Sequence, residues 1–82
     1  MSIQDEALEH LVKGIVENPD DVEVRASTHP KRGRALVVTV HPEDMGRVIG
    51  RSGRTAQALR TVVNALTPGR KVRIDFVDPD GR

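Results

Sequence analysis

The 82-residue sequence contains no cysteine. This absence excludes a disulfide framework and a thiolate metal site, and it fits the reducing environment of the cytosol. The N-terminal segment MSIQDEALEH is acidic and lacks the basic and apolar regions of a signal peptide. No apolar run approaches the ~18 residues that a membrane span requires. We therefore expect a soluble, cytoplasmic protein, and this length is typical of one domain.

Aromatic residues are almost as scarce, because the chain has no tryptophan, no tyrosine and a single phenylalanine. Nucleic-acid-binding folds of the RRM and OB types stack bases on aromatic side chains, so this composition argues against both. Phe76 alternates with Val72 and Ile74, which favours a position on the apolar face of a strand, in the protein core, over a role as a stacking surface. The P-loop and Rossmann glycine patterns are also missing, which leaves a nucleotidase or kinase with little support.

Hydrophobic periodicity predicts the order α-β-β-α-α-β. The predicted helices cover residues 2–17, a short stretch from Pro42 to Gly50, and 54–66; the predicted strands cover 22–28, 35–40 and 71–77. The first two strands should form an antiparallel hairpin. The apolar stripe of the longest helix consists of Ala58, Leu59, Val62, Val63 and Leu66. The fold class is therefore α+β, with three helices packed on one face of a three-stranded sheet.

Charge is distributed unevenly along the chain, although the net charge is only +1. Residues 1–30 carry a net charge of −5, residues 31–60 carry +5, and residues 61–82 carry +1. A concentration of positive charge in the middle third favours a polyanionic partner. A basic surface that serves only solubility is the alternative.

The sequence RVIGRSGRT, residues 47–55, places Gly50 and Gly53 three apart between two predicted helices. Glycine adopts positive φ at little cost and lets another backbone approach closely. The N–H groups at the start of the following helix suit a phosphate, and Arg47, Arg51 and Arg54 add positive charge. The loop therefore predicts a clamp for a phosphodiester backbone. A plain connector, with Gly50 as a helix C-cap, is the alternative.

No group of residues predicts catalysis. His10, His29 and His41 lie in three separate elements without metal-ligand spacing. Glu43 and Asp44 are explained by the positive end of a helix dipole. Ser52 has no base positioned by the sequence to activate it, and a hydrogen bond to phosphate is its simpler role. We therefore expect no enzymatic activity, no metal and no cofactor.

The segment GRVIGRSGRTAQALRTVVNAL, residues 46–66, resembles the core of the KH domain, whose hallmark is an I-G-x-x-G between two helices. The order of elements is similar to the type II arrangement, and the size is similar to small bacterial single-domain KH proteins of the KhpA type. The resemblance implies one KH domain over residues 1–82, with its core at about 20–77 and a frayed tail at 78–82.

The resemblance also implies a binding site. Matching positions for the backbone clamp are Ile49, Gly50, Arg51, Ser52 and Gly53, and such a loop holds about four nucleotides. Ala56 stands where the family usually has a large aliphatic residue, which should make the floor of the binding groove shallower. Binding should extend to Arg47 and Arg54 through their charge.

We therefore expect a non-catalytic protein that binds single-stranded RNA, such as an RNA chaperone or a post-transcriptional regulator. The alternative is a protein-interaction module, because the resemblance implies a homodimer or a heterodimer with a larger KH-containing protein. The two functions are compatible, since one small domain binds RNA weakly and pairing adds avidity.

Overall fold

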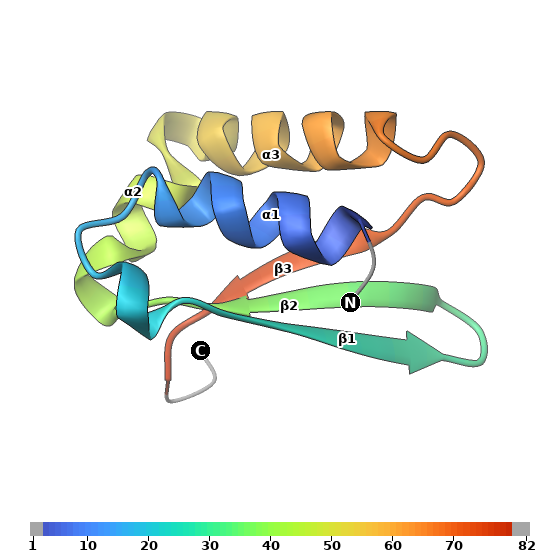
Figure 1. Cartoon of the computed structure of the whole chain (residues 1–82), viewed down its shortest axis with the longest axis horizontal. Coiled ribbons are helices and arrows are strands. Elements are labelled where there is room, and N and C mark those ends of the chain that lie inside the picture. Colours follow the sequence, from blue (N-terminus) through green and yellow to red (C-terminus); the bar gives the residue numbers. More distant parts are fainter. Residues whose placement is uncertain (1–2, 80–82) are drawn as a thin grey trace.

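A computed structural model describes residues 3–79, so the last part of the expected tail, residues 80–82, lies outside the described residues. The elements follow the expected order, with three short 3-10 helices (η) between them (Figure 1). Their bounds are α1 Ile3–Lys13, η1 Pro19–Asp21, β1 Glu23–His29, β2 Gly33–Thr39, η2 Pro42–Asp44, α2 Met45–Ile49, η3 Arg51–Gly53, α3 Arg54–Ala65 and β3 Arg73–Val77.

The sheet has the strand order β1-β2-β3. β1 and β2 form the expected antiparallel hairpin, with Glu23 opposite Thr39. β2 and β3 pair in parallel, and parallel neighbours need a long crossover connection. α2 and α3 provide that crossover, and Figure 1 shows α1 and α3 lying side by side over the same face of the sheet. The predicted α+β class is confirmed.

The core lies between this face and the helices. Leu36, Val38 and Val40 alternate along β2 and its end, and all three are fully buried. Ile74 and Phe76 continue the layer on β3, opposite Leu36 and Val38, so the prediction that Phe76 belongs to the core is confirmed. The helices contribute the buried residues Leu8, Val12, Val48, Ala56, Leu59 and Val63.

α1 ends at Lys13, four residues before its predicted end. Gly14 follows, and glycine weakens a helix. The N–H groups of Glu17 and Asn18 donate to the carboxylate of Asp44, each at 3.1 Å. Asp44 is 1% exposed and so ties the connection after α1 to the start of α2. This contact joins residues 26 or more positions apart, so sequence periodicity contains no sign of it.

The predicted apolar stripe of α3 is buried at only two of its five positions. Leu59 and Val63 are buried, but Ala58 is exposed, and Val62 and Leu66 remain 49% and 44% exposed. Ala56 is buried instead. The stripe spans two neighbouring faces of the helix, and only one of them meets the sheet. Among residues 3–79, no helix is long and apolar enough to cross a membrane.

Candidate nucleic-acid interface

The loop between α2 and α3 consists largely of residues with positive φ. Gly50 ends α2 at φ 75° and ψ 175°, and Gly53 precedes α3 at φ 75° and ψ 14°. Ser52 adopts φ 55° and ψ 27° and is the one non-glycine residue with positive φ in the part of the chain that the structure describes. These conformations turn the chain sharply from one helix into the next.

The two glycines have different surroundings. A Cβ atom on Gly50 would lie 2.3 Å from Oγ1 and 2.9 Å from the backbone nitrogen of Thr55. A Cβ atom on Gly53 would have no neighbour within 4 Å. Gly50 is therefore required by close packing inside the protein, whereas Gly53 leaves a bare surface that a ligand backbone can approach.

Both helix starts in the loop lack a side-chain cap. Gly50 and Gly53 occupy the N-cap positions of η3 and α3, and neither can supply a side-chain acceptor. The N–H of Gly53 donates to the carbonyl of Gly50 at 3.2 Å, and that of Arg54 donates to Arg51. These two N–H groups are therefore occupied within the loop. The remaining N–H groups in the first turn of α3 have no partner within the helix itself, and a phosphate oxygen suits them as an acceptor.

The arginines of the site differ in their pairing. Arg51 and Arg54 are exposed, and no ion pair of either one occurs within residues 3–79. Arg47 instead places Nη2 3.0 Å from Oε1 of Glu17 and Nε 3.5 Å from Oδ1 of Asp44. The positive charge next to the loop therefore comes from Arg51 and Arg54 more than from Arg47.

The other two expected site residues flank the same turn. Ser52 is exposed on the loop, and Ile49, the last residue of α2, is half-buried and packs against the core. All the residues predicted for the clamp thus lie in one continuous stretch at the start of α3. Ala56 is part of the core rather than of the groove described next.

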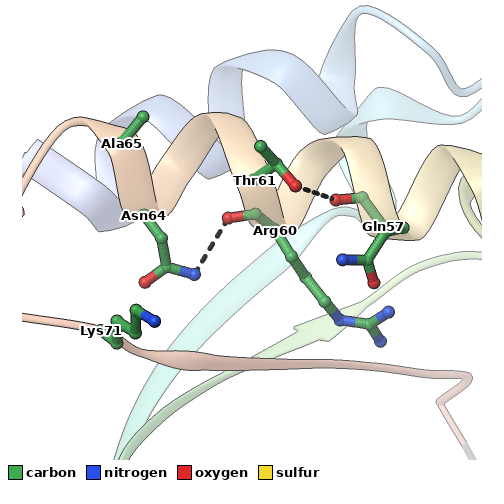
Figure 2. A pocket seen from close by; sticks show the side chains of 6 residues that line it. All are labelled: Gln57, Arg60, Thr61, Asn64, Ala65 and Lys71. Atoms are coloured by element: carbon green, nitrogen blue, oxygen red, sulfur yellow. Dashed lines mark hydrogen bonds between the residues drawn. The ribbon is translucent and has the colours of Figure 1, made fainter.

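A groove of about 410 Å³ lies along α3, beginning at Gln57, about one turn past the start of the helix (Figure 2). Its lining consists of Gln57, Arg60, Thr61, Asn64, Ala65 and Lys71. Figure 2 shows Gln57, Arg60 and Asn64 extending from α3 toward the strand that follows Lys71. We call this feature the α3 groove. Its walls are polar and basic, as a surface for a polyanion should be.

Two side chains of the α3 groove hold the outer edge of β3. Arg60 donates from Nε to the carbonyl of Ile74 at 3.1 Å, and its guanidinium carbon lies 6.0 Å from the ring centre of Phe76. Asn64 pairs with both backbone groups of Val72, at 2.7 Å and 3.1 Å. The same residues that line the groove therefore also join α3 to β3 and to Val72, which precedes β3.

The groove residues were not among the predicted site residues, although two sequence signals point to them. Residues 57, 60, 61 and 64 are polar and repeat at helical spacing, which defines one face of α3. In addition, residues 45–74 contain seven arginines or lysines and no acidic residue. The open face of the sheet differs, since Arg25 and Arg73 pair there with Glu23 and Asp75. Within residues 3–79, no cluster of histidine and acidic side chains could hold a metal ion.

The KH-domain family model of KhpA and KhpB matches residues 5–76. The RNA-binding protein KhpA of Streptomyces coelicolor is 68% identical over 76 residues, which cover 93% of this chain and 94% of that protein. The RNA-binding protein KhpA of Mycobacterium bovis is 59% identical over 75 residues, covering 92% and 91%. That of Halalkalibacterium halodurans is 48% identical over 75 residues, covering 87% and 95%. The glycine loop between two helices, the mixed three-stranded sheet and these matches lead to one conclusion: the chain belongs to the KhpA/KhpB family of KH domains.

Proposed function

We propose that this protein binds single-stranded RNA in the cytoplasm and holds its backbone on the Gly50–Gly53 loop, as an RNA chaperone or post-transcriptional regulator. The relatives named above are RNA-binding proteins. KH domains of this family are not enzymes, and this chain is not one. The proposed activity is therefore recognition without a chemical step.

The observation that carries the proposal is the pair of helix starts that have glycine at their N-cap positions. Beside them lie two exposed arginines, Arg51 and Arg54, which form no ion pair within residues 3–79. Phosphate oxygens can accept from the remaining N–H groups in the first turn of α3, and the positive end of the α3 dipole favours the same charge. The bare surface at Gly53 allows close approach of the RNA backbone. Bases would then follow the α3 groove, which is bounded by β3 and suits a single strand better than a duplex.

The test is the double variant Arg51→Asp with Ser52→Asp. Both side chains are exposed, and aspartate tolerates the left-handed conformation of Ser52 better than most residues. Folding should therefore survive, as measured by circular dichroism and thermal melting. Two negative charges where phosphates must pass should weaken binding of an RNA of about four nucleotides by about a hundredfold, as measured by fluorescence anisotropy.

A matched control changes Lys31→Gln with Arg32→Asp. These exposed residues lie in the turn between β1 and β2, at the opposite end of the molecule from the loop in Figure 1. The control lowers the net charge by the same amount, so it reports any long-range electrostatic effect. Equal binding by the parent and the loop variant would show that the loop is only a connector.

A second function has its own observation, the exposed apolar face of α3. Val62 and Leu66 are 49% and 44% exposed, and Ala58 and Ala65 are exposed on the same helix. We propose that this face, the α3 apolar face, pairs with a second KH-containing chain, either a copy of itself or a larger protein. Such pairing would place two RNA sites in one particle and add avidity.

The variant Val62→Glu tests the pairing. Glutamate is a good helix former, so the variant should melt like the parent, while a charge at the centre of an apolar contact should leave it monomeric. Light scattering over a concentration series measures the change. Ser27→Glu, on the exposed face of β1, adds the same charge elsewhere and should change nothing. A variant that remains as associated as the parent would remove α3 from the contact.

A further inference from the structure

A second basic cavity lies beyond the far end of the α3 groove. It has a volume of about 370 Å³ and is lined by Gln4, Arg34, Arg70 and Lys71. Three of its four lining residues are cationic, and Lys71 also lines the α3 groove. The two cavities are therefore neighbours, and a basic surface extends from the glycine loop past the end of α3. We call the second cavity the Arg70 pocket.

The buried side chain of Gln4 holds several parts of the Arg70 pocket in place through hydrogen bonds. Its side chain is 2% exposed and donates from Nε2 to Oγ1 of Thr67 at 2.6 Å and to the carbonyl of Arg70 at 3.0 Å. Its Oε1 accepts from Nη1 of Arg34 at 3.4 Å. A buried amide thus fixes the backbone at Arg70 and holds the guanidinium of Arg34 in the wall of the pocket.

The charges of the pocket are only partly balanced. Asp5 lies 3.0 Å from Nη2 of Arg34 and offsets that charge. Arg70 and Lys71 are exposed, and neither forms an ion pair with any acid among residues 3–79. Arg70 and Lys71 are also too far along the chain to interact with the negative end of the α3 dipole, because α3 ends at Ala65 and the dipole effect fades within the last turn.

We propose that the Arg70 pocket binds a phosphate of the RNA strand beyond the nucleotides held by the glycine loop. α3 has 12 residues and spans about 18 Å at 1.5 Å per residue. A strand that follows the α3 groove for this length passes Arg60 and Lys71 and arrives at Arg70. The inference rests on the proposed RNA binding, and it adds a longer footprint with a second electrostatic anchor.

The test compares RNAs of about four and about ten nucleotides. The parent should bind the longer RNA more tightly, whereas Arg70→Glu should bind the shorter RNA like the parent and lose most of the gain with length, about two- to tenfold. Arg70→Gln should lose part of the gain and flatten the salt dependence by about 0.7, for the longer RNA alone. Amide resonances of residues 67 and 69–71 should shift with the longer RNA only.

Arg32→Glu is the matched control, because Arg32 is exposed in the turn between β1 and β2 and lines neither cavity. If Arg32→Glu loses as much as Arg70→Glu, the effect is general repulsion and the pocket has no specific role. Retention of the length gain by Arg70→Glu would overturn the pocket while leaving the loop clamp intact. Failure of the parent to bind either RNA would overturn the proposed function itself. A change of oligomeric state without a change in RNA binding would overturn the phosphate site and assign the pocket to a contact with a second copy of the chain.

Discussion

At the scale of single residues, Gly50 and Gly53 share a sequence motif and a positive φ but are required for different reasons. Gly50 combines φ 75° with ψ 175°, a region of backbone conformation that only glycine occupies readily. It also lies against the backbone of Thr55. Gly53 is in the ordinary left-handed region and faces open space. The first glycine therefore serves the fold, and the second serves both the turn and the surface.

We predict unequal costs for the two alanine substitutions. Gly53→Ala should lower the free energy of unfolding by about 1–2 kcal/mol, the strain of an alanine in the left-handed region. Gly50→Ala should cost about 3 kcal/mol or more, because a contact with Thr55 at well under 3 Å adds to the strain. Urea denaturation measures both values. Equal losses would show that the contact with Thr55 relaxes without cost.

Arg47 shows how far single residues can be read from the sequence. Its place beside the glycine loop predicts a phosphate contact, and that prediction is still untested. Its ion pair with Glu17 joins residues 30 positions apart, so no local sequence pattern predicts this pair. The loop motif itself was recognisable because its geometry depends on neighbouring residues only. Arg60 on α3 and Lys71 before β3 line the same groove, and bringing the two together required the fold.

At the scale of elements, Asp44 connects the end of α1 to η2 and α2. Burial raises the pKa of its carboxyl, but hydrogen bonds from the backbone of Glu17 and from the side chain and backbone of Asn18, together with nearby Arg47, outweigh burial and leave the pKa below the ordinary 3.8. A lowered pKa in the folded state means that ionised Asp44 stabilises the fold. This contribution is complete above the unfolded-state pKa and is lost as the pH falls toward the folded-state value.

We predict that Asp44→Asn is less stable than the parent at neutral pH and loses less stability on acidification below about pH 4. The amide keeps one acceptor oxygen but gives up the charge that three N–H donors and Arg47 stabilise. Thermal melting from neutral to acidic pH measures both effects. Glu43→Gln, at the exposed neighbouring position, should follow the parent. Parallel curves for Asp44→Asn and the parent would contradict the role of Asp44.

Secondary structure was predictable where local pattern decides it. The hairpin turn, the helix end at Gly50 and the alternation around Phe76 all depend on residues close in sequence, and their positions agree with the structure. The faces of α3 were less predictable. Its apolar residues cover more of the helix than one contact needs, so the sequence does not reveal whether Leu59 or Val62 meets the sheet. The exposed apolar residues that are left over, Val62 and Leu66, form the surface proposed to contact a partner.

At the scale of the whole molecule, opposite charges are gathered in different parts of the chain. Residues 1–30 carry a net charge of −5, whereas residues 45–74 have seven basic residues and no acid. The basic stretch runs from α2 to the start of β3 and includes the loop and α3, which carry the proposed RNA surface. The molecule is therefore nearly neutral overall but polarised along the chain, and a polyanion should be drawn to the basic stretch.

This polarisation predicts a strong salt dependence. Each phosphate contact on a single strand should contribute about −0.7 to the slope of log K against log salt concentration. Arg51→Ala should weaken binding of unrelated RNA sequences by similar factors and flatten the slope by about that amount. Titrations at several salt concentrations provide the measurement. An affinity independent of salt would count against a backbone clamp.

The parallel pairing of β2 with β3 also sets an order on folding. β1 and β2 meet through a tight turn, whereas the chain between Thr39 and Arg73 must close as one large loop before the second ladder can form. Closing a large loop costs entropy before any contact compensates for it, so distant pairing is the slower event. The glycine loop lies within that closing segment, between the two paired strands. A chain that has formed only its hairpin therefore lacks the proposed RNA surface, and we expect RNA binding to arise in the step that pairs β3 with β2.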